Sequence, residues 1–482
     1  MKKFLSVILI VLMVAMVWLH PVCAPNSQIL SENRTDKVIR IWYTDEELSS
    51  YMDNAAISYY NKTGIRVQPK LVSGLEYLEG INGATLHEEE YPDLYVVGNE
   101  SLEKAILSGL ATSLEDPTHI LNTGHYPQIA LDAVTYQGEY IGYPFYYETS
   151  VFLYNRTYLE AIAAQAVAEQ EASAQAEEDA QDDMQEEEVQ EDAQTEDAGA
   201  EPEVITADSI LPTSMVGILE FANSYDPPEG MEAFLKWDVT DILYNYGFAG
   251  AYMDVGGPAG DDRSRIDIYN GNAMYALGVY QDFNQFFSIE TEEVSYDSVV
   301  QEFMEGKIMF TFANTGVIET LEEAKENGTM SFEYGIAPME MLNTTLQAKP
   351  LSITNAIVVN GYSPEKEIAE DFAAYLSGEY VSNLFARSGK LCAYALPEYE
   401  YEAMTDARLS YNASVPIPKF VESGNYWVLA ELCYTNIWEG EDVNETLRDF
   451  ADHINSQVLG EAAEPITEIP TPEVVESYIK SE

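Results

Sequence analysis

Apolar and polar positions near the start of the chain follow a strand–helix–strand pattern. Residues 38–43 (VIRIWY) predict a buried strand, and the acids at 45–47 behind it favour a helix start because negative charge stabilises helix N-termini. Apolar residues then recur at helical spacing as Leu48, Met52, Ala55, Ala56 and Tyr59, and Gly64 ends the helix. Residues 65–72 predict a second strand, so this unit predicts a parallel sheet.

The same alternation continues through most of the chain. Further strands are predicted at 93–98, 140–147, 150–155, 308–312, 333–338 and 353–360. Helices are predicted from Ser101 and in the stretch after Pro364 that Gly378 ends. The predicted fold class is α/β.

One long segment breaks this pattern. Between Glu160 and Glu203 there are seventeen Asp and Glu residues and no Lys or Arg, among Ala and Gln. This composition cannot build a core and repels itself, so we expect an insert at 160–204 that is disordered or a solvated helix projecting from the fold. It lacks the spaced Asp, Asn and Gly pattern of a calcium loop. Residues 459–482, rich in Glu and Pro, predict an acidic tail.

Composition narrows the class of protein. A chain of 482 residues is long enough for two lobes. Its net charge of -60, from 23 basic and 83 acidic residues, argues against nucleic acid as a partner because such binding needs a basic surface. Five histidines and three cysteines show no metal-ligand spacing, and no cofactor is expected. Cys392 and Cys433 leave a disulfide possible without requiring one.

The N-terminal residues predict export. Two lysines precede an apolar run at 4–19, which is too short to span a membrane comfortably but is typical of a signal peptide. Cys23 stands where a lipoprotein signal has its acylated cysteine, although residues 20–22 (HPV) form a poor lipobox. We expect residues 1–24 to be the signal and Cys23 to carry lipid. Ordinary cleavage or an uncleaved anchor are the alternatives.

Segments spread along the chain resemble the extracellular solute-binding proteins of carbohydrate ABC importers, the maltodextrin-binding type. They are IRIWYTDEE (39–47), YPDLYVVGNESLEKAILSGL (91–110), YIGYPFYYETSVFLYNRTYL (140–159), FLKWDVTDILYN (234–245), EFMEGKIMFTFANTG (302–316), FEYGIAPM (332–339), LSITNAIVVNGYSPEKEIAEDFAAYL (351–376) and SGNYWVLAELCYTNIWEG (423–440). No single segment is decisive, and the evidence lies in their order over about four hundred residues.

The resemblance implies a two-lobed periplasmic-binding-protein fold of type II, with a ligand cleft at the hinge. Lobe 1 would comprise residues 36–147 and 351–396, and lobe 2 residues 148–350 and 397–458. The chain would cross between lobes near Glu148 and Thr149, with Tyr146 facing the ligand. It also implies a small carbohydrate ligand, a permease in the membrane as partner, an extracellular location and no catalysis; we expect a monomer.

A sugar offers an apolar ring face to aromatic side chains and hydroxyls to carboxylates and amides. The resemblance places the following residues in the cleft: Trp42, Asp45, Tyr147, Glu148, Trp237, Asp238, Asp241, Asn314, Tyr426 and Trp427. The aromatics would stack on the sugar, and Asp45, Glu148 and Asp238 or Asp241 would accept hydrogen bonds. One of Tyr426 and Trp427 would face inward while the other packs.

Each assignment has a structural alternative. Trp42 could pack in the core of its own lobe, Glu148 could bind a backbone amide, and Asp238 could cap a helix. The sequence also departs from the family at Gly316, where a stacking tryptophan is missing, and Asn314 would offer an amide instead. The identity and length of the sugar therefore do not follow from the resemblance.

Two other functions fit parts of the sequence. A secreted glycoside hydrolase also combines paired carboxylates with aromatics. The same fold with an acidic, aromatic cleft also suits a polyamine or another cationic ligand.

Overall fold

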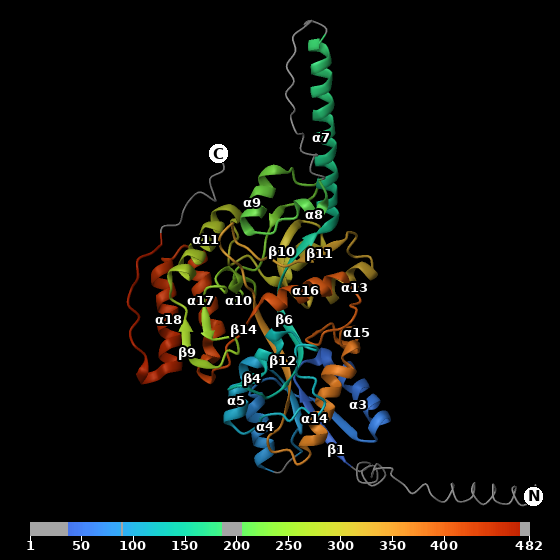
Figure 1. Cartoon of the computed structure of the whole chain (residues 1–482), viewed down its shortest axis with the longest axis vertical. Helices are drawn as coiled ribbons and strands as arrows, with labels where there is room; N and C mark the ends of the chain where they lie inside the picture. Colours follow the sequence, from blue (N-terminus) through green and yellow to red (C-terminus); the bar gives the residue numbers. More distant parts are fainter. Residues whose placement is uncertain (1–36, 88–89, 186–204, 473–482) are drawn as a thin grey trace, which may run out of the picture.

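A computed structural model describes residues 37–87, 90–185 and 205–472 of the 482-residue chain. The protein has two lobes, which Figure 1 shows one above the other. We call the part built on strands β1, β2 and β3 lobe 1, and the part built on β7, β10 and β11 lobe 2. Strand β6 (Tyr143–Asn155) runs through both.

Lobe 1 is formed by the strand–helix–strand unit that the sequence predicts. Its strands are β1 (Val38–Tyr43), β2 (Arg66–Leu71), β3 (Leu94–Gly98) and β12 (Leu351–Val359), with the short β13 (Leu391–Cys392) and the hairpin of β4 (Thr135–Tyr136) and β5 (Glu139–Tyr140). Its helices are α3 (Ser49–Thr63), α4 (Tyr77–Leu86), α5 (Leu102–Leu107), α6 (Gln128–Ala133), α14 (Lys366–Ala374) and α15 (Leu384–Ser388). Strand β1 pairs in parallel with both β2 and β3, while β12 pairs with β3 antiparallel.

Lobe 2 has a smaller sheet and more helices. Its strands are β7 (Ala233–Leu235), β10 (Ile308–Asn314) and β11 (Tyr334–Ala337), with a hairpin of β8 (Asp254–Gly256) and β9 (Asp262–Asp267). Its helices are α7 (Arg156–Gln185), α8 (Ala207–Ile210), α9 (Met215–Ser224), α10 (Ile242–Asn245), α11 (Gly271–Phe287), α12 (Tyr296–Met304), α13 (Val317–Glu326), α16 (Glu402–Ala413), α17 (Tyr426–Trp438) and α18 (Val443–Leu459). The predicted α/β class is confirmed.

Strand β6 joins the two sheets. Its first half pairs with β12 up to Thr149, and from Ser150 onward it pairs with β10. The sequence predicts two strands separated at Glu148 and Thr149, but the structure has one strand of 13 residues. The prediction of a break was wrong because Thr149 is buried and Glu148 is the only residue of β6 that is not fully buried. The change of partner nevertheless lies where the crossing was expected.

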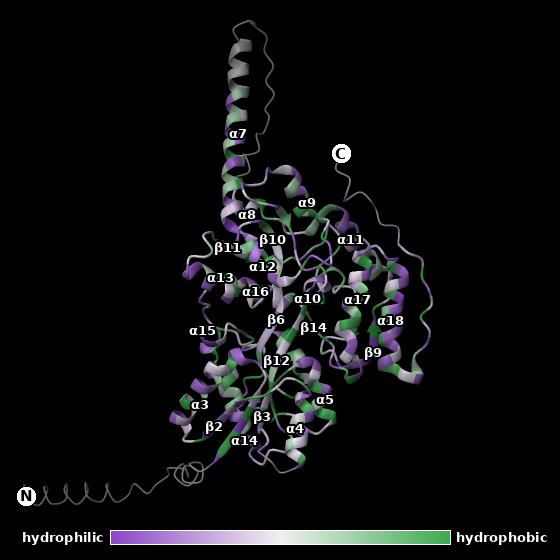
Figure 2. Cartoon of the chain, turned by 180° about the vertical axis from the view of Figure 1, so that it is seen from behind, coloured by the Kyte–Doolittle hydropathy of each residue, from purple (hydrophilic) through white to green (hydrophobic). Residues whose placement is uncertain are grey.

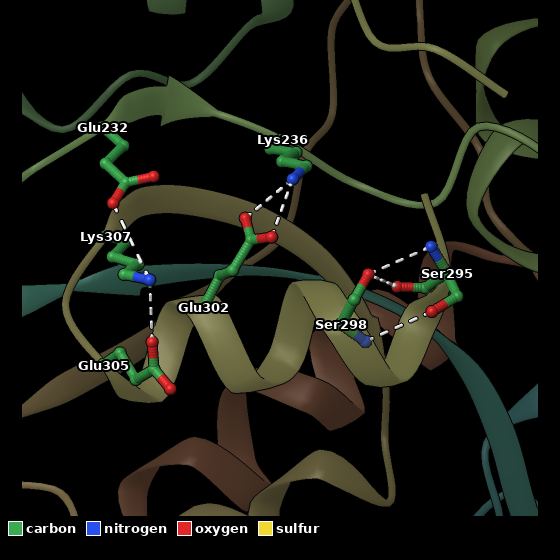
Figure 3. A network of polar contacts seen from close by, with 7 residues as sticks. All are labelled: Glu232, Lys236, Ser295, Ser298, Glu302, Glu305 and Lys307. Atoms are coloured by element: carbon green, nitrogen blue, oxygen red, sulfur yellow. Dashed lines mark hydrogen bonds and ion pairs between the residues drawn. The ribbon is translucent and has the colours of Figure 1, made fainter. Parts of the chain in front are cut away.

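Polar contacts fix α12 across the edge of the lobe 2 sheet (Figure 3). Ser295 and Ser298 form a capping box at the start of this helix, in which each side chain accepts from the other's backbone N–H. At its other end Glu302 pairs with Lys236, which follows β7, at 2.7 Å. The helix is thereby held against β7 and β10.

The acidic insert begins as a helix. Helix α7 continues without interruption to Gln185 and projects away from lobe 2 (Figure 1), as expected for a solvated helical insert. Residues 186–204 lie outside the described residues. None of the described helices is both long and apolar enough to cross a membrane. Helix α18 shows hydrophilic and hydrophobic residues in turn along its length (Figure 2), because one of its faces packs in the core.

The C-terminal stretch is more ordered than the predicted tail. Residues 463–472 run back along α18 and α11, where Ile466 and Ile469 pack on the core of lobe 2. Asn444 donates to the carbonyl of Ile469 at 2.9 Å, and Arg448 pairs with Glu468 at 2.9 Å. Two isoleucines within the Glu- and Pro-rich sequence therefore anchor residues 463–472 to lobe 2, and residues 473–482 of the predicted tail lie outside the described residues.

The two cysteines within the described residues are both free. Cys392 lies in a core that extends through lobe 1, whereas Cys433 lies in the helical core of lobe 2. The disulfide that the sequence left open is therefore absent.

The lobes also meet away from β6, around residues 417–422. Lys419 is 0% exposed, and its ammonium donates to the carbonyl of Asp132 in lobe 1 at 2.8 Å and to that of Ala259 in the β8–β9 turn. Beside it the buried Glu103 of α5 accepts from Arg263 of β9 at 2.9 Å. Figure 1 shows β9 next to β4 and α5 at this contact.

Burial makes this contact sensitive to pH. Loss of solvation lowers the pKa of Lys419 to about 7, although the charges of Asp261 and Asp132 oppose the shift. In the unfolded chain this lysine stays charged up to about pH 10.4. Between about pH 7 and pH 10.4 the unfolded state therefore binds more protons than the folded state. The free energy of unfolding therefore rises with pH in this window.

We expect Lys419→Met to remove that pH dependence. Between about pH 7 and pH 9, the wild-type protein should gain about 2–3 kcal/mol in stability relative to the variant, at 1.36 kcal/mol for each pKa unit. Urea unfolding of both proteins at several pH values measures this. Parallel stability curves over that range would contradict it.

Candidate ligand-binding site

A polar cavity lies at the edge of lobe 1 where β1 and β3 end. The C-terminal ends of parallel strands meet at one edge of a sheet, where α/β proteins bind ligands. The cavity has a volume of about 390 Å³, within the range of small-molecule sites. Its polar lining comprises Thr44, Asp45, Glu76, Tyr77, Glu79, Glu100, Ser101, Lys104, Tyr146 and Asn355.

Asp45, at the mouth of this cavity, is where the sequence predicts a site residue. It caps a short 3-10 turn (Glu46–Leu48) by accepting from the backbone N–H of Glu47 at 3.0 Å. Its other oxygen pairs with Lys390 at 3.0 Å, and Glu47 also pairs with Lys390 at 2.5 Å. One lysine thus binds two carboxylates, which keeps it charged and holds it in place.

Glu148 lies next to this group. Its side chain points the same way as that of Tyr146, because alternate residues of a strand share a face. Burial raises the pKa of Glu148, and the charges of Asp45 and Glu47 add to the rise while Lys390 opposes it. Among the described residues no hydrogen bond or ion pair holds its carboxylate, so the predicted backbone-amide alternative does not apply.

Tyr147 points to the other face of β6, and the prediction that it contacts ligand was wrong. Its ring stacks on that of Tyr411 with centroids 3.9 Å apart and an angle of 7° between the planes. It is buried in the core, while Tyr146 lines the cavity with Lys390 5.8 Å above its ring. Adjacent residues of a strand point to opposite faces of the sheet, so Tyr147 and Glu148 cannot both face the cavity.

Glu100 is a cavity residue that the sequence did not single out. It follows the end of β3, and a Cβ at Gly98 would lie 2.2 Å from its Oε2, so glycine lets this carboxyl group fold back over the strand end. Ser101 donates to Oε1 at 3.2 Å, while Oε2 is buried without a partner among the described residues. Burial raises the pKa of Glu100, and the charge of Glu148 raises it further.

Two predicted residues gather on lobe 2. Trp427, partly exposed at the start of α17, donates from its indole nitrogen to Glu431 at 2.5 Å. Burial raises the pKa of Glu431. The hydrogen bond from Trp427 opposes this rise, and the negative charge of the nearby Asp241 adds to it. Asp241 also caps α10 by accepting from Leu243, and burial raises its pKa.

Asn314 ends β10, directly opposite Ser150 where β6 changes partners. It hydrogen bonds the Tyr244 hydroxyl, whose ring stacks on that of Tyr296 at 5.2 Å. Asn314 is therefore near the joint between the lobes, as expected, with its amide already engaged by lobe 2.

Two aromatic residues expected in the cleft are core residues instead. Trp237 is 0% exposed, packs edge-on against Trp438, and donates to Asn245 at 2.8 Å. Tyr426 is buried with its hydroxyl 3.1 Å from that of Tyr246. The prediction of Trp237 as a stacking platform was wrong, and of the pair 426–427 it is Tyr426 that packs.

Trp42 follows its structural alternative, whereas Asp238 is engaged within lobe 2 without being the helix N-cap that was its alternative, because Asp241 caps α10. Trp42 is 8% exposed, packs with Tyr95 and Ile81, and has Lys70 4.6 Å above its ring. Asp238 accepts from the backbone N–H groups of Thr240 and Tyr296 at 2.9 Å each, so it organises the chain before α12. Neither side chain offers a ligand a free surface.

Sequence reasoning missed Glu47, Glu100 and Lys390, whereas the resemblance already placed Tyr146 facing the ligand. Glu100 could have been found, because it follows a predicted parallel strand as Asp45 does. No comparable signal marks Lys390, which reaches Asp45 only through the packing of α15 on α3.

The described residues contain no group of three or more His, Cys, Asp or Glu placed to hold a metal ion. Cys23 and the predicted signal at 1–24 lie outside the described residues.

Solved structures share the fold. A cyclo/maltodextrin-binding protein complexed with maltotetraose superposes with a TM-score of 0.67 at 15% identity, covering 88% of this chain and 98% of that one. An extracellular solute-binding protein from Staphylococcus aureus in complex with maltose gives a TM-score of 0.68 at 15% identity, covering 88% and 99%. At this identity the likeness shows the fold alone, and it confirms the predicted two-lobed architecture.

Sequence relatives give the family. The maltodextrin-binding protein MdxE of Bacillus subtilis (strain 168) is 22% identical over 236 residues, which is 47% of this chain and 55% of that protein, so the match spans about half the length of this curated relative. The model of the bacterial extracellular solute-binding protein family matches residues 58–386, more than half of the chain. The chain therefore belongs to the family of bacterial extracellular solute-binding proteins.

Proposed function

We propose that this protein is the substrate-binding component of an ABC importer and binds a small carbohydrate between its lobes without catalysing a reaction. One observation carries the proposal. Glu148 sits where β6 changes partners, beside a polar cavity, with a carboxylate that no described residue binds. A carboxylate accepts hydrogen bonds from hydroxyls more strongly than a neutral group does, so this position suits a sugar.

The family supports a carbohydrate as ligand. The curated relative is a maltodextrin-binding protein, and two of the structural neighbours hold maltotetraose and maltose. Trp42, Trp237 and Tyr426 are buried here, and Tyr146 is only 4% exposed with Lys390 over its ring, so stacking on the sugar would depend on Trp427. Recognition by carboxylates and hydroxyls would then outweigh ring stacking, and the sugar differs in its contacts from a maltodextrin held between tryptophans.

Binding would act through closure of the lobes. Lobe 1 would comprise residues 36–147 and 351–396, lobe 2 residues 148–350 and 397–458, and the joint would lie at Glu148–Ser150. A ligand that touches the cavity on lobe 1 and Asp241, Asn314 or Trp427 on lobe 2 would favour the closed state, because it gains contacts only there. The closed form would dock on the permease.

The location follows from the expected signal. We propose that the protein is exported as a monomer, that Cys23 carries lipid, and that the chain is held at the outer face of the cell membrane. The acidic insert would then project from lobe 2 into the surrounding medium, where its charge keeps it solvated.

The other functions have weaker support. A glycoside hydrolase needs an acid and a base or nucleophile across a glycosidic bond, whereas Asp45 and Glu47 are bound to Lys390. A polyamine would use the acids but leave the hydroxyl and amide lining of the cavity without a role. The family comparisons favour a sugar over both.

We expect sugars to raise the melting temperature of the protein. A ligand at 100 times its dissociation constant stabilises a folded protein by about 2.7 kcal/mol, and closure should also reduce the radius of gyration in X-ray scattering. A panel of mono- and disaccharides tested at millimolar concentration checks both. If the protein releases sugar from a glycoside substrate and no ligand reduces its radius of gyration, the result contradicts the transport function and supports a glycoside hydrolase.

Glu148→Gln should weaken sugar binding by about 10- to 100-fold, because a charge-assisted hydrogen bond contributes about 1.5–3 kcal/mol. The variant should fold normally, since it relieves a desolvated charge. Calorimetric titration measures the affinity. Glu302→Gln, the same substitution in the lobe 2 ion pair with Lys236, is the matched control and should bind like the wild type. Equal affinities for all three proteins would remove Glu148 from the site.

A further inference from the structure

The cavity of lobe 1 holds more negative than positive charge. Four carboxylates line it, those of Asp45, Glu76, Glu79 and Glu100, and Glu148 lies beside it. The nearby cations are already bound: Lys104 pairs with Glu79 at 2.6 Å, and Lys390 with Asp45 and Glu47. An anionic ligand would find no free cation among these residues.

Three of these acids make no ion pair among the described residues: the exposed Glu76, and the more buried Glu100 and Glu148. Oε2 of Glu100 is buried without a partner among the described residues, and the carboxylate of Glu148 makes no ion pair there. A buried polar atom without a partner destabilises the protein, and a ligand group bound to that atom would remove this cost. The unpartnered atoms indicate what the missing group must be: a hydrogen-bond donor, and preferably a charged one.

Electrostatics favours a positive donor. Burial raises the pKa of Glu100 and of Glu148. The charge of Glu148 adds to the rise at Glu100, which hydrogen bonds from its own backbone and from Ser101 oppose. At Glu148 the charges of Asp45 and Glu47 add to the rise, and Lys390 opposes it. Such repulsion between acids in a poorly solvated site is what a cation placed between them relieves.

The rest of the lining suits hydroxyl groups. Thr44, Ser101 and Tyr77 bring hydroxyls and Asn355 an amide, and the Tyr77 hydroxyl is buried without a partner among the described residues. A plain amine would leave these groups unused, whereas a sugar would hydrogen bond them. The two sets of groups line one cavity, so one ligand would meet both.

We propose that the ligand is a carbohydrate that carries a free amino group, and that Glu100 and Glu148 bind its ammonium. This rests on the proposed function and narrows it to one class of sugar.

Sugars that differ in one substituent test this. Glucose, glucosamine and N-acetylglucosamine share a ring and differ at one carbon, and cellobiose, the glucosamine dimer and N,N′-diacetylchitobiose extend the series to two rings. Calorimetric titration at about pH 7 should give the amino sugar of each series an affinity at least about tenfold higher than the hydroxyl or acetamide sugar. Glu100→Gln should reduce that preference to about twofold or less, and Glu302→Gln, outside the cavity, should keep it.

The outcomes separate this inference from the proposed function. Binding of neutral sugars without preference for the amine overturns the inference and leaves the sugar-binding function intact. Tighter binding of putrescine or spermidine than of any sugar overturns the carbohydrate part of both. A preference that persists in Glu100→Gln and also in Glu148→Gln overturns the assignment of the two acids.

Discussion

The structure depends on one shared strand. Strand β6 completes the sheet of lobe 1 through β12 and the sheet of lobe 2 through β10, and the exchange of partners takes place between Thr149 and Ser150. Each half of β6 is fixed by its own ladder of hydrogen bonds, so relative motion of the lobes would have to be absorbed by backbone angles at this exchange and at the two other proposed crossings, near residues 351 and 397. Glu148 therefore lies next to the point where β6 changes partners and beside the proposed ligand site.

Buried charge has two different roles in this protein. Around residues 417–422 it is satisfied: Lys419 has carbonyl partners from both lobes, and Glu103 has Arg263 and a backbone N–H. At the cavity it is not, because Glu100 and Glu148 keep atoms without partners. Satisfied groups hold a given arrangement of the lobes, whereas unsatisfied ones favour an arrangement that brings them a partner. The difference is a physical reason for a ligand to change the shape of the molecule.

Much of the fold was readable from the sequence because periodicity reports burial directly. The strands at 38–43 and 94–98 and the helix that Gly64 ends are where the pattern predicts them. The site was harder. Asp45 and Glu148, which the resemblance placed in the cleft, lie at or beside the cavity of lobe 1, and their status as ligand contacts stays a prediction. Trp237 and Tyr426 were misassigned because an aromatic residue beside an acid carries no information on which side of a helix or loop it faces. Lys390 depends on contacts more than three hundred residues apart, which no local pattern contains.

The central claim is that ligand binding closes the lobes about the exchange point in β6. Its most direct measurement is the distance between spin labels at Leu75→Cys, an 85% exposed position beside the lobe 1 cavity, and Val428→Cys, exposed on α17 of lobe 2. With the sugar that gives the largest thermal shift, the distribution of distances should move to shorter values in the wild-type background, and Glu148→Gln should need about 10- to 100-fold more sugar for the same movement. A distribution that does not change at saturating sugar would contradict closure and the account built on it.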